Sequence, residues 1–256
     1  MSKIFILARH TFKELIRKKD FYVLLVLFAG LVVFFYGETF FGIEGISRYL
    51  KDVGFSFVIL FSMIVAVSFS AKQIPQELEC KTIYPLLAKP VSRTQFILGK
   101  FLGSLFISII TFTAFYSLYL VFIVSKGESA GPVLILQSYI LSCFLLVFIS
   151  SFAILFSLFF TVSANIAITL MFYFFIYWYN GVLREILLLS SQKFSYFYNI
   201  LYYILPHFEF FDMRIRIVHL WDPLPLWVIT SISIYTVLYT GMIVWLTSVI
   251  FKRRGL

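Results

Sequence analysis

Residues 129–183 read SAGPVLILQSYILSCFLLVFISSFAILFSLFFTVSANIAITLMFYFFIYWYNGVL, and none of these 55 residues is charged. As one helix the stretch would extend about 80 Å at 1.5 Å per residue, whereas the hydrocarbon core of a bilayer is about 30 Å thick. The stretch must therefore fold back once. We predict the bend at residues 161–165 (TVSAN), because small polar residues favour turns and helix caps.

The composition of the whole chain also indicates a membrane protein. Of its 256 residues, 61% are hydrophobic and only 13% are charged, against roughly a quarter charged in a soluble domain. We predict an all-α integral membrane fold, organised as one transmembrane domain over residues 1–256, with six transmembrane helices. Their expected positions are about 21–37, 53–71, 97–125, 132–160, 165–183 and 225–251.

The distribution of Lys and Arg predicts how these spans are oriented. With the N-terminus inside the cell, the inner segments (1–20, 72–100, 161–165 and 252–256) hold 14 basic residues and the outer segments hold 7. Basic residues near helix ends are retained on the cytoplasmic side, so we expect a multi-pass protein of the cell membrane with both termini in the cytoplasm. The net charge of +9 is divided among these loops, which favours contact with anionic lipid and not with nucleic acid.

Two segments outside the spans are expected to lie at the membrane surface. Residues 3–19 carry apolar side chains at helical spacing and predict an N-terminal interfacial helix, with a simple basic tail as the alternative. Residues 184–222 are rich in Tyr and Phe, whose rings collect at the headgroup level, and predict short outer helices between spans five and six, broken at Pro206. A ligand gate is the alternative. The aromatic residues predicted to face outward are Tyr202, Tyr203, Phe208 and Phe210.

The chain lacks the motifs of an enzyme or a nucleotide-binding protein. It contains no GxxxxGK[ST] loop, no HExxH and no GxSxG. The uncharged stretches that form these spans, residues 21–37, 53–71, 101–125, 129–183 and 223–251, contain no Asp, Glu, Lys, Arg or His, whereas ion-coupled transporters usually carry such residues within the membrane. We therefore expect no catalytic, metal or cofactor site in this chain, and energy for any transport would have to come from another protein.

The charged segment between the second and third spans, residues 72–100, reads KQIPQELECKTIYPLLAKPVSRTQFILGK. Ser92 and Gln95 fit a capping box, which predicts that the next membrane helix begins near Arg93. Upstream, Thr82 can cap a short helix that Pro90 ends. A short helix held between prolines can transmit a displacement from a soluble protein, and an ordinary connector is the alternative.

The same segment resembles a pattern found in permeases of ABC-2 type exporters, especially permeases associated with the maturation of copper enzymes. The pattern is E-x-E-x-x-T-[IL]-x-x-L-L-[AS]-x-P-[VI]-S-R-x-x-[FIV]-x-x-G-K, and here it begins at Glu77 and ends at Lys100. Residues 8–21 are similar to the entry helix of that group, and residues 205–212 (LPHFEFFD) are similar to its outer segment before the last span.

The resemblance implies a six-helix exporter permease, not itself an enzyme, that pairs with a second copy and is driven by a separate ATPase subunit. In such a transporter a short cytoplasmic coupling helix within residues 72–93 docks on the ATPase, which binds the ATP. The coupling residues implied in this way are Glu77, Glu79, Thr82, Ile83, Leu86, Leu87 and Arg93. A structural role is the alternative for each, for example Thr82 as a helix cap and Arg93 as an anchor of the topology.

Two other classes of function are compatible with the residues. One is an ATP-independent channel or carrier. The other is a membrane scaffold that assembles an extracytoplasmic enzyme, for which the aromatic outer segment offers a surface to a partner. An apolar lining without charge does not select among peptide, lipid, drug, ion and metal or sulfur cargo.

Overall fold

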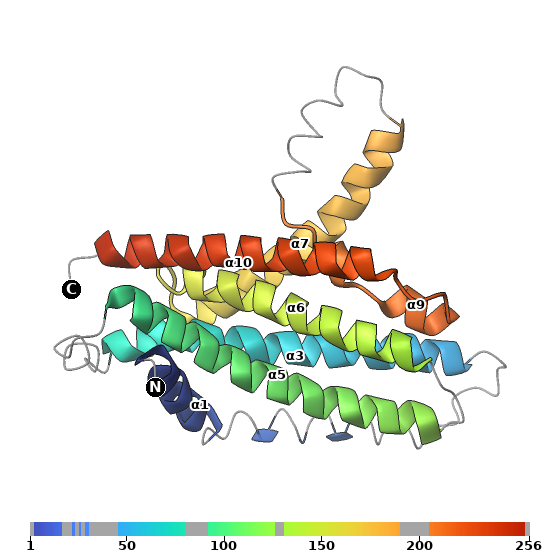
Figure 1. Cartoon of the computed structure of the whole chain (residues 1–256), viewed down its shortest axis with the longest axis horizontal. Helices are drawn as coiled ribbons and strands as arrows, with labels where there is room; N and C mark the ends of the chain where they lie inside the picture. The colour runs from blue at the N-terminus through green and yellow to red at the C-terminus, as the bar shows by residue number, and fades with distance from the viewer. Residues whose placement is uncertain are drawn as a thin grey trace.

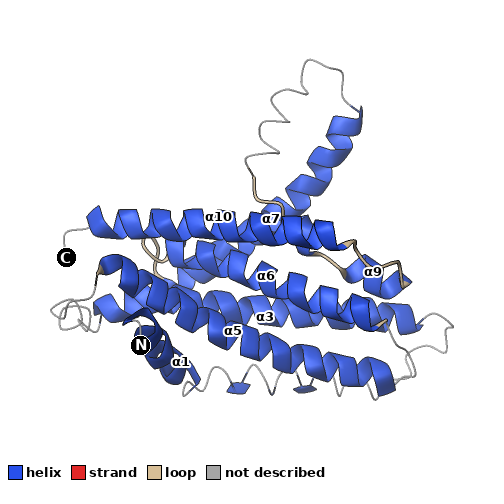
Figure 2. Cartoon of the chain, in the orientation of Figure 1, coloured by secondary structure: helices blue, strands red, loops and turns tan. Residues whose placement is uncertain are grey.

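The computed structural model describes residues 3–16, 22–23, 26, 29–30, 46–79, 92–125, 131–189 and 205–253. These residues are helical or form short loops, and none of them lies in a strand (Figure 2). The long helices are α3 (Ile46–Glu79), α5 (Arg93–Ser125), α6 (Pro132–Phe156), α7 (Val162–Leu189) and α10 (Leu226–Arg253). The short ones are α1 (Lys3–Ile16), the 3-10 helix η2 (Phe208–Phe211) and α9 (Arg214–His219).

Five helices of the described residues are long and apolar enough to cross a membrane, by length and composition. They are α3, α5, α6, α7 and α10, each of which overlaps one predicted span. The first predicted span, at 21–37, lies mostly outside the described residues, so a sixth crossing stays a prediction. Among the residues that the structure describes, the predicted all-helical fold is confirmed.

Helix α6 lies at the centre of the bundle. It contacts α3, α5, α7 and α10, and also the short helices η2 and α9. Figure 1 shows α3, α5, α6 and α10 running along the long axis of the molecule, with α1 packed across α5. In the most apolar part of α6, 61% of the residues are buried, whereas in the most apolar part of α7 only 22% are buried. The C-terminal turns of α7 stand away from the other helices (Figure 1). The exposed apolar side chains of α7 therefore form surface suited to lipid or to another protein.

The bend predicted at residues 161–165 is found a few residues earlier, at 157–161, between the end of α6 and the start of α7. Asn165 accounts for the turn, because its side-chain amide donates to the carbonyl oxygen of Ala153 at 2.9 Å. Thr169 in turn donates to the side-chain oxygen of Asn165 at 3.0 Å. The carbonyl oxygen of Ala153 also accepts from the backbone N–H of Ser157, so the Asn165 amide adds a second hydrogen bond that ties the end of α6 to α7.

Helix α3 does not end at residue 71, where the second predicted span ends, but continues to Glu79. The first part of the charged segment is therefore an extension of a membrane helix and not a loop. Pro75 lies within this extension, where a proline removes one backbone hydrogen bond but does not end the helix here. A displacement at Glu79 can thus be carried along a single helix.

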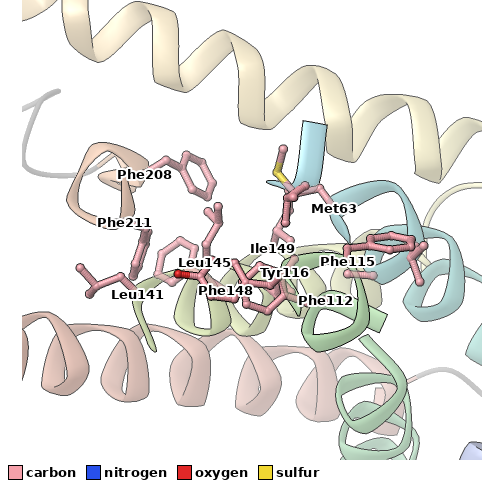
Figure 3. Packing of buried hydrophobic residues seen from close by; sticks show 14 of the residues in the cluster. Met63, Phe112, Phe115, Tyr116, Leu141, Leu145, Phe148, Ile149, Phe208 and Phe211 are labelled. Carbon is pink, nitrogen blue, oxygen red and sulfur yellow. The ribbon is translucent and has the colours of Figure 1, made fainter. Parts of the chain in front are cut away.

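The main hydrophobic core surrounds Phe148 of α6 (Figure 3). The ring of Phe148 lies 5.5 Å from that of Phe208 and 5.7 Å from that of Phe211, both in η2. On its other sides it contacts Tyr235 and Tyr239 of α10. The short helix η2 is therefore held inside the bundle by aromatic packing.

Helix α1 packs closely on α5 at Gly103. A Cβ atom at Gly103 would lie 2.5 Å from the Cβ of Thr11 and 2.9 Å from the carbonyl oxygen of Ala8. Ala8 and Thr11 are buried in this contact, while Phe5 and Ile6 are exposed. The predicted N-terminal helix is present, and glycine permits its close approach to α5. Its position in a membrane interface stays a prediction.

Candidate functional site

The first candidate region is the Glu77 end, where the C-terminal ends of α3 and α10 meet the N-terminal end of α5 (left in Figure 1). Lys100 of α5 donates to Glu77 of α3, with 2.5 Å between Nζ and Oε1. The side chain of Lys100 is only 4% exposed and that of Glu77 is 15% exposed. A buried ammonium group requires such a carboxylate, so the pair joins the two helices.

Arg93 connects the same region to α10. Its Nη1 atom donates to the carbonyl oxygens of Phe251 at 3.2 Å and Lys252 at 3.1 Å. Carbonyls in the last turn of a helix lack an intrahelical partner and carry partial negative charge, which suits a guanidinium. The rings of Phe96 and Phe251 also stack, with centroids 5.8 Å apart. The start of α5 is therefore attached to the end of α10 by polar and apolar contacts.

The capping box predicted for the start of α5 is present. The backbone N–H of Gln95 donates to Oγ of Ser92 at 3.2 Å, and the backbone N–H of Ser92 donates to Oε1 of Gln95 at 3.1 Å. Helix α5 begins at Arg93, as the motif predicts.

The second candidate region is the Asp212 end, formed by η2, α9 and the parts of α3 and α7 that they contact. The Asp212 carboxylate accepts hydrogen bonds from the Tyr177 hydroxyl at 2.6 Å and from Nη2 of Arg214, also at 2.6 Å. Nη2 of Arg214 also donates to the Tyr177 oxygen at 2.8 Å, and Nη1 of Arg214 donates to Oγ of Ser56 at 3.4 Å. One ion pair therefore bridges α3 and α7.

The charges at the Asp212 end stabilise each other. Burial alone would raise the pKa of Asp212, but hydrogen bonds from Arg214 and Tyr177, with the positive charge of Arg214, hold that pKa below its usual range. The hydrogen bonds to Asp212 raise the pKa of Arg214. Both groups are therefore charged at neutral pH and together contribute no net charge.

Further polar contacts fix the segment that leads to the last helix. The Asn180 amide of α7 donates to the carbonyl oxygen of Pro206 at 3.1 Å, and the backbone N–H of His207 donates to the Tyr235 hydroxyl at 3.2 Å. Gln137 of α6 both donates to the carbonyl oxygen of Leu224 and accepts from its backbone N–H, each at 2.8 Å. The segment 205–224 is therefore bound to α6, α7 and α10.

The structure separates the predicted coupling residues by environment. Glu77 is paired with Lys100, and Arg93 contacts the end of α10. Glu79, the last residue of α3, is exposed. The remaining four, and the predicted coupling helix that contains them, lie outside the described residues: Thr82, Ile83, Leu86 and Leu87.

The predicted aromatic surface is wrong for Phe208, which is 1% exposed because η2 packs into the core beside Phe148. Phe210 points the other way on η2 and is 44% exposed. Tyr202 and Tyr203 lie outside the described residues. Of the two residues that the structure describes, only Phe210 has an exposed side chain, and its place on the outer side of the membrane stays a prediction.

The network of Tyr177, Asp212 and Arg214 was missed from the sequence. A carboxylate and a guanidinium two residues apart inside an aromatic segment were a usable signal, because such charges are seldom placed near apolar surface without a partner. Nothing in the sequence indicated Ser56, which is 158 residues from Arg214.

The comparison with protein families agrees with the motif at residues 77–100. A family model described as ABC-2 family transporter protein matches residues 5–256. The chain belongs to this family. A comparison with curated protein sequences gives no match.

As an ABC-2 family transporter protein, the chain is a multi-pass membrane protein and a permease subunit of an ABC transporter. Permeases of this family are generally components of transport and not catalysts. Among the residues that the structure describes, no group of His, Cys, Asp and Glu is arranged to hold a metal ion.

Proposed function

We propose that this chain is the permease of an exporter driven by a separate ATPase subunit, which docks on residues 72–93. The proposal depends on the family match together with one structural observation: both described ends of that segment are bound to long helices. The ATPase binds and hydrolyses ATP, and this chain supplies the path through the membrane.

The connections at the Glu77 end explain how docking would act on the whole bundle. From Ser56 to Glu79, α3 is one helix with a rise of about 35 Å at 1.5 Å per residue. The Glu77–Lys100 pair carries a displacement of α3 into α5, and Arg93 carries it into α10. A partner that favours one of two arrangements of these ends would therefore shift the bundle between two conformations.

The complete exporter in this proposal contains two copies of the permease in the cell membrane, with both termini of each in the cytoplasm. The orientation rests on the excess of basic residues in the predicted inner segments. Pairing is supported by α7, which leaves Met171, Phe175 and Trp178 at least 60% exposed. These side chains suit a second copy, although lipid can also cover them.

The test of docking is a charge reversal at Glu79, which is exposed and so can change without loss of packing. Purified Glu79→Lys should insert and fold normally but lose co-purification with the ATPase and lose stimulation of ATP hydrolysis. The matched control is Asp52→Lys, an exposed carboxylate on the same helix at its other end, which should leave both unchanged. Normal docking of Glu79→Lys would contradict the contact assigned to this residue.

Glu77 needs a different experiment, because Glu77→Lys would place two ammonium groups together and disturb folding. The double variant Glu77→Lys with Lys100→Glu restores an ion pair in reversed order. If Glu77 acts only by joining α3 to α5, the double variant should recover much of the ATPase stimulation that either single variant loses. If the ATPase contacts Glu77 directly, no recovery is expected.

The alternatives have their own readouts. Transport by the purified chain in liposomes without an ATPase would favour a channel or carrier. A crosslink from Phe210, replaced by a photoreactive residue, to an extracytoplasmic protein would support a scaffold if no ATPase binds at the other end. Phe210 is suited to this experiment because its side chain is exposed, whereas Phe208 is buried.

A further inference from the structure

A cavity of about 340 Å³ lies within one copy of the chain, between α3, α7 and the segment that contains η2 and α9. Pockets that hold small molecules usually measure roughly 300–1,000 Å³ and are mostly apolar with a few polar groups. Phe174 lines the cavity and is itself 49% exposed, which places one wall at the surface of the bundle. A molecule dissolved in the membrane therefore has a short route to the cavity.

Four of the five polar side chains that line the cavity form a single group. Ser56, Tyr177, Asp212 and Arg214 all line it, and hydrogen bonds connect Arg214 to each of the other three. Apart from the hydroxyl group of Tyr173, the remaining lining side chains are apolar. The cavity thus has one polar end and an apolar body.

The apolar body extends along one face of α3. Ser56, Ile59 and Met63 are spaced by three and four residues, so they lie one above another on the helix. The rise from Ser56 to Met63 is about 10 Å at 1.5 Å per residue. Phe211 and Leu145 contribute further apolar wall. This shape suits a chain or a narrow ring system, with its polar group beside Ser56.

The charges at the polar end select against a charged ligand. Asp212 and Arg214 are paired at 2.6 Å, so an added anion would be repelled by Asp212 and an added cation by Arg214. A hydroxyl or carbonyl group meets neither repulsion. Either group can accept from the guanidinium of Arg214, and a hydroxyl can also donate to the hydroxyl oxygen of Tyr177 or Ser56.

We propose that this cavity binds an apolar molecule that carries one uncharged, hydrogen-bonding head group. Binding itself is a property of the single chain. That the bound molecule is transported cargo rests on the exporter function proposed above. The same chemistry is found in a neutral lipid of the surrounding bilayer and in a cargo that enters from it.

The binding test uses a fatty alcohol with a diazirine in its chain, added to the purified full-length protein in lipid nanodiscs without any ATPase. After illumination, mass spectrometry locates the labelled peptides. We expect labelling of the cavity residues in α3 and α7 that excess unlabelled alcohol reduces by about tenfold. Labelling of exposed apolar positions outside the cavity, such as Ile110, should not saturate. Uniform labelling that no competitor reduces would overturn the proposal.

Two variants test the position of the site. Ile59→Trp adds a large side chain to the cavity wall and should reduce the saturable labelling by about tenfold. Ile110→Trp adds the same side chain at an exposed position of α5 outside the cavity and should leave the saturable labelling unchanged. Equal saturable labelling in both variants would overturn the assignment.

The head-group selectivity is tested by a variant that keeps the shape of the cavity. In the unmodified protein the alcohol probe should label better than the matching fatty acid or alkylamine. Asp212→Asn leaves the positive charge of Arg214 without its carboxylate, so preference should move toward the fatty acid by about tenfold. An unchanged order of the three probes would contradict the electrostatic part of the proposal, whatever happens to Ile59→Trp.

The source of the ligand is distinguished by extraction. A resident lipid would be recovered in equal amount with the purified protein and would block the probe until it is removed. If the ligand is cargo, the probe should reach the cavity both before and after lipid is removed from the purified protein. Labelling of the cavity by the probe should then change when the ATPase and ATP are added. The first outcome keeps the site and overturns the cargo interpretation. Because labelling itself needs no ATPase, its failure is separate from a failure of docking.

Discussion

At the Glu77 end an ion pair joins two long helices, whereas at the Asp212 end an ion pair lies within one short segment and contacts two long helices from outside. Lys100 and Glu77 come from α5 and α3, and their side chains are 4% and 15% exposed. Asp212 and Arg214 are two residues apart, and their side chains are 17% and 34% exposed. The first pair lies between two helices of the bundle, and the second lies in the segment with η2 and α9 that packs against the bundle.

The two ends therefore differ in what they can do: at the Glu77 end the long helices are connected to one another, and at the Asp212 end there is a cavity. The Glu77 end has helix ends connected to one another, so a displacement there is shared by α3, α5 and α10. The Asp212 end has a cavity and a segment held by separate hydrogen bonds to α3 and α7. We expect the first end to move as a unit and the second to open by exchange of single hydrogen bonds.

Removal of one charge at the Glu77 end should have the largest effect. Glu77→Ala leaves the buried Lys100 without its carboxylate, and loss of one partner of a buried pair costs about 3–5 kcal/mol. The free energy of unfolding, measured by titration with a denaturing detergent in mixed micelles, should fall by that amount. Replacement of both residues by Met should recover most of it. A loss below about 1 kcal/mol would show that the pair behaves as a surface contact.

The same kind of change at the Asp212 end should have a smaller effect. Asp212→Asn keeps the shape but removes the charge that Arg214 faces, and Arg214 can turn partly toward solvent because its side chain is 34% exposed. We expect a loss of about 1–2 kcal/mol in the same titration, with Asp222→Asn, an exposed carboxylate on the same segment, as the control. A loss as large as that of Glu77→Ala would remove the contrast between the two ends.

Acid should reproduce the effect of Asp212→Asn reversibly. The pKa of Asp212 is lower in the folded protein than in the unfolded chain, where it is about 3.9. Its contribution to stability is therefore complete above that value and is lost as the pH falls through the folded pKa. The difference in Tm between the native protein and Asp212→Asn should shrink as the pH is lowered toward this range. A constant difference would contradict the shift.

The smallest effect is expected for the helix cap at the Glu77 end. Ser92→Ala removes the hydroxyl that accepts from the backbone N–H of Gln95, and loss of such a cap costs roughly 1 kcal/mol or less at an exposed site. The start of α5 should fray, which hydrogen exchange at Phe96 and Ile97 can detect. Ser92→Thr should preserve the exchange rates. Unchanged exchange in Ser92→Ala would show that Arg93 and Phe96 hold this helix end without the cap.

The features that were predicted correctly depend on residues close in sequence. The capping box needs only Ser92 and Gln95, three residues apart, and it located the start of α5. The long uncharged stretch at 129–183 located the turn between α6 and α7 to within a few residues, because a bilayer limits the length of a helix. The pattern from Glu77 to Lys100 indicated the family that the comparison then showed.

The features that were wrong or missed depend on packing between distant residues. Aromatic residues suit a membrane surface and a protein core equally, so Phe208 was placed outside although η2 inserts it beside Phe148. The extension of α3 to Glu79 was missed because charged residues suggested a loop, while the helix is held there by Lys100, 23 residues away.

The sequence by itself determined that this chain is a helical membrane protein of the ABC-2 family with no nucleotide-binding loop of its own, because length, charge and local motifs are properties of neighbouring residues. Only the tertiary structure decided which charges meet. It paired Glu77 with Lys100, attached Arg93 to α10 and gathered Ser56, Tyr177, Asp212 and Arg214 around one cavity. Such contacts follow from how helices pack, and helices of similar composition can pack in many ways.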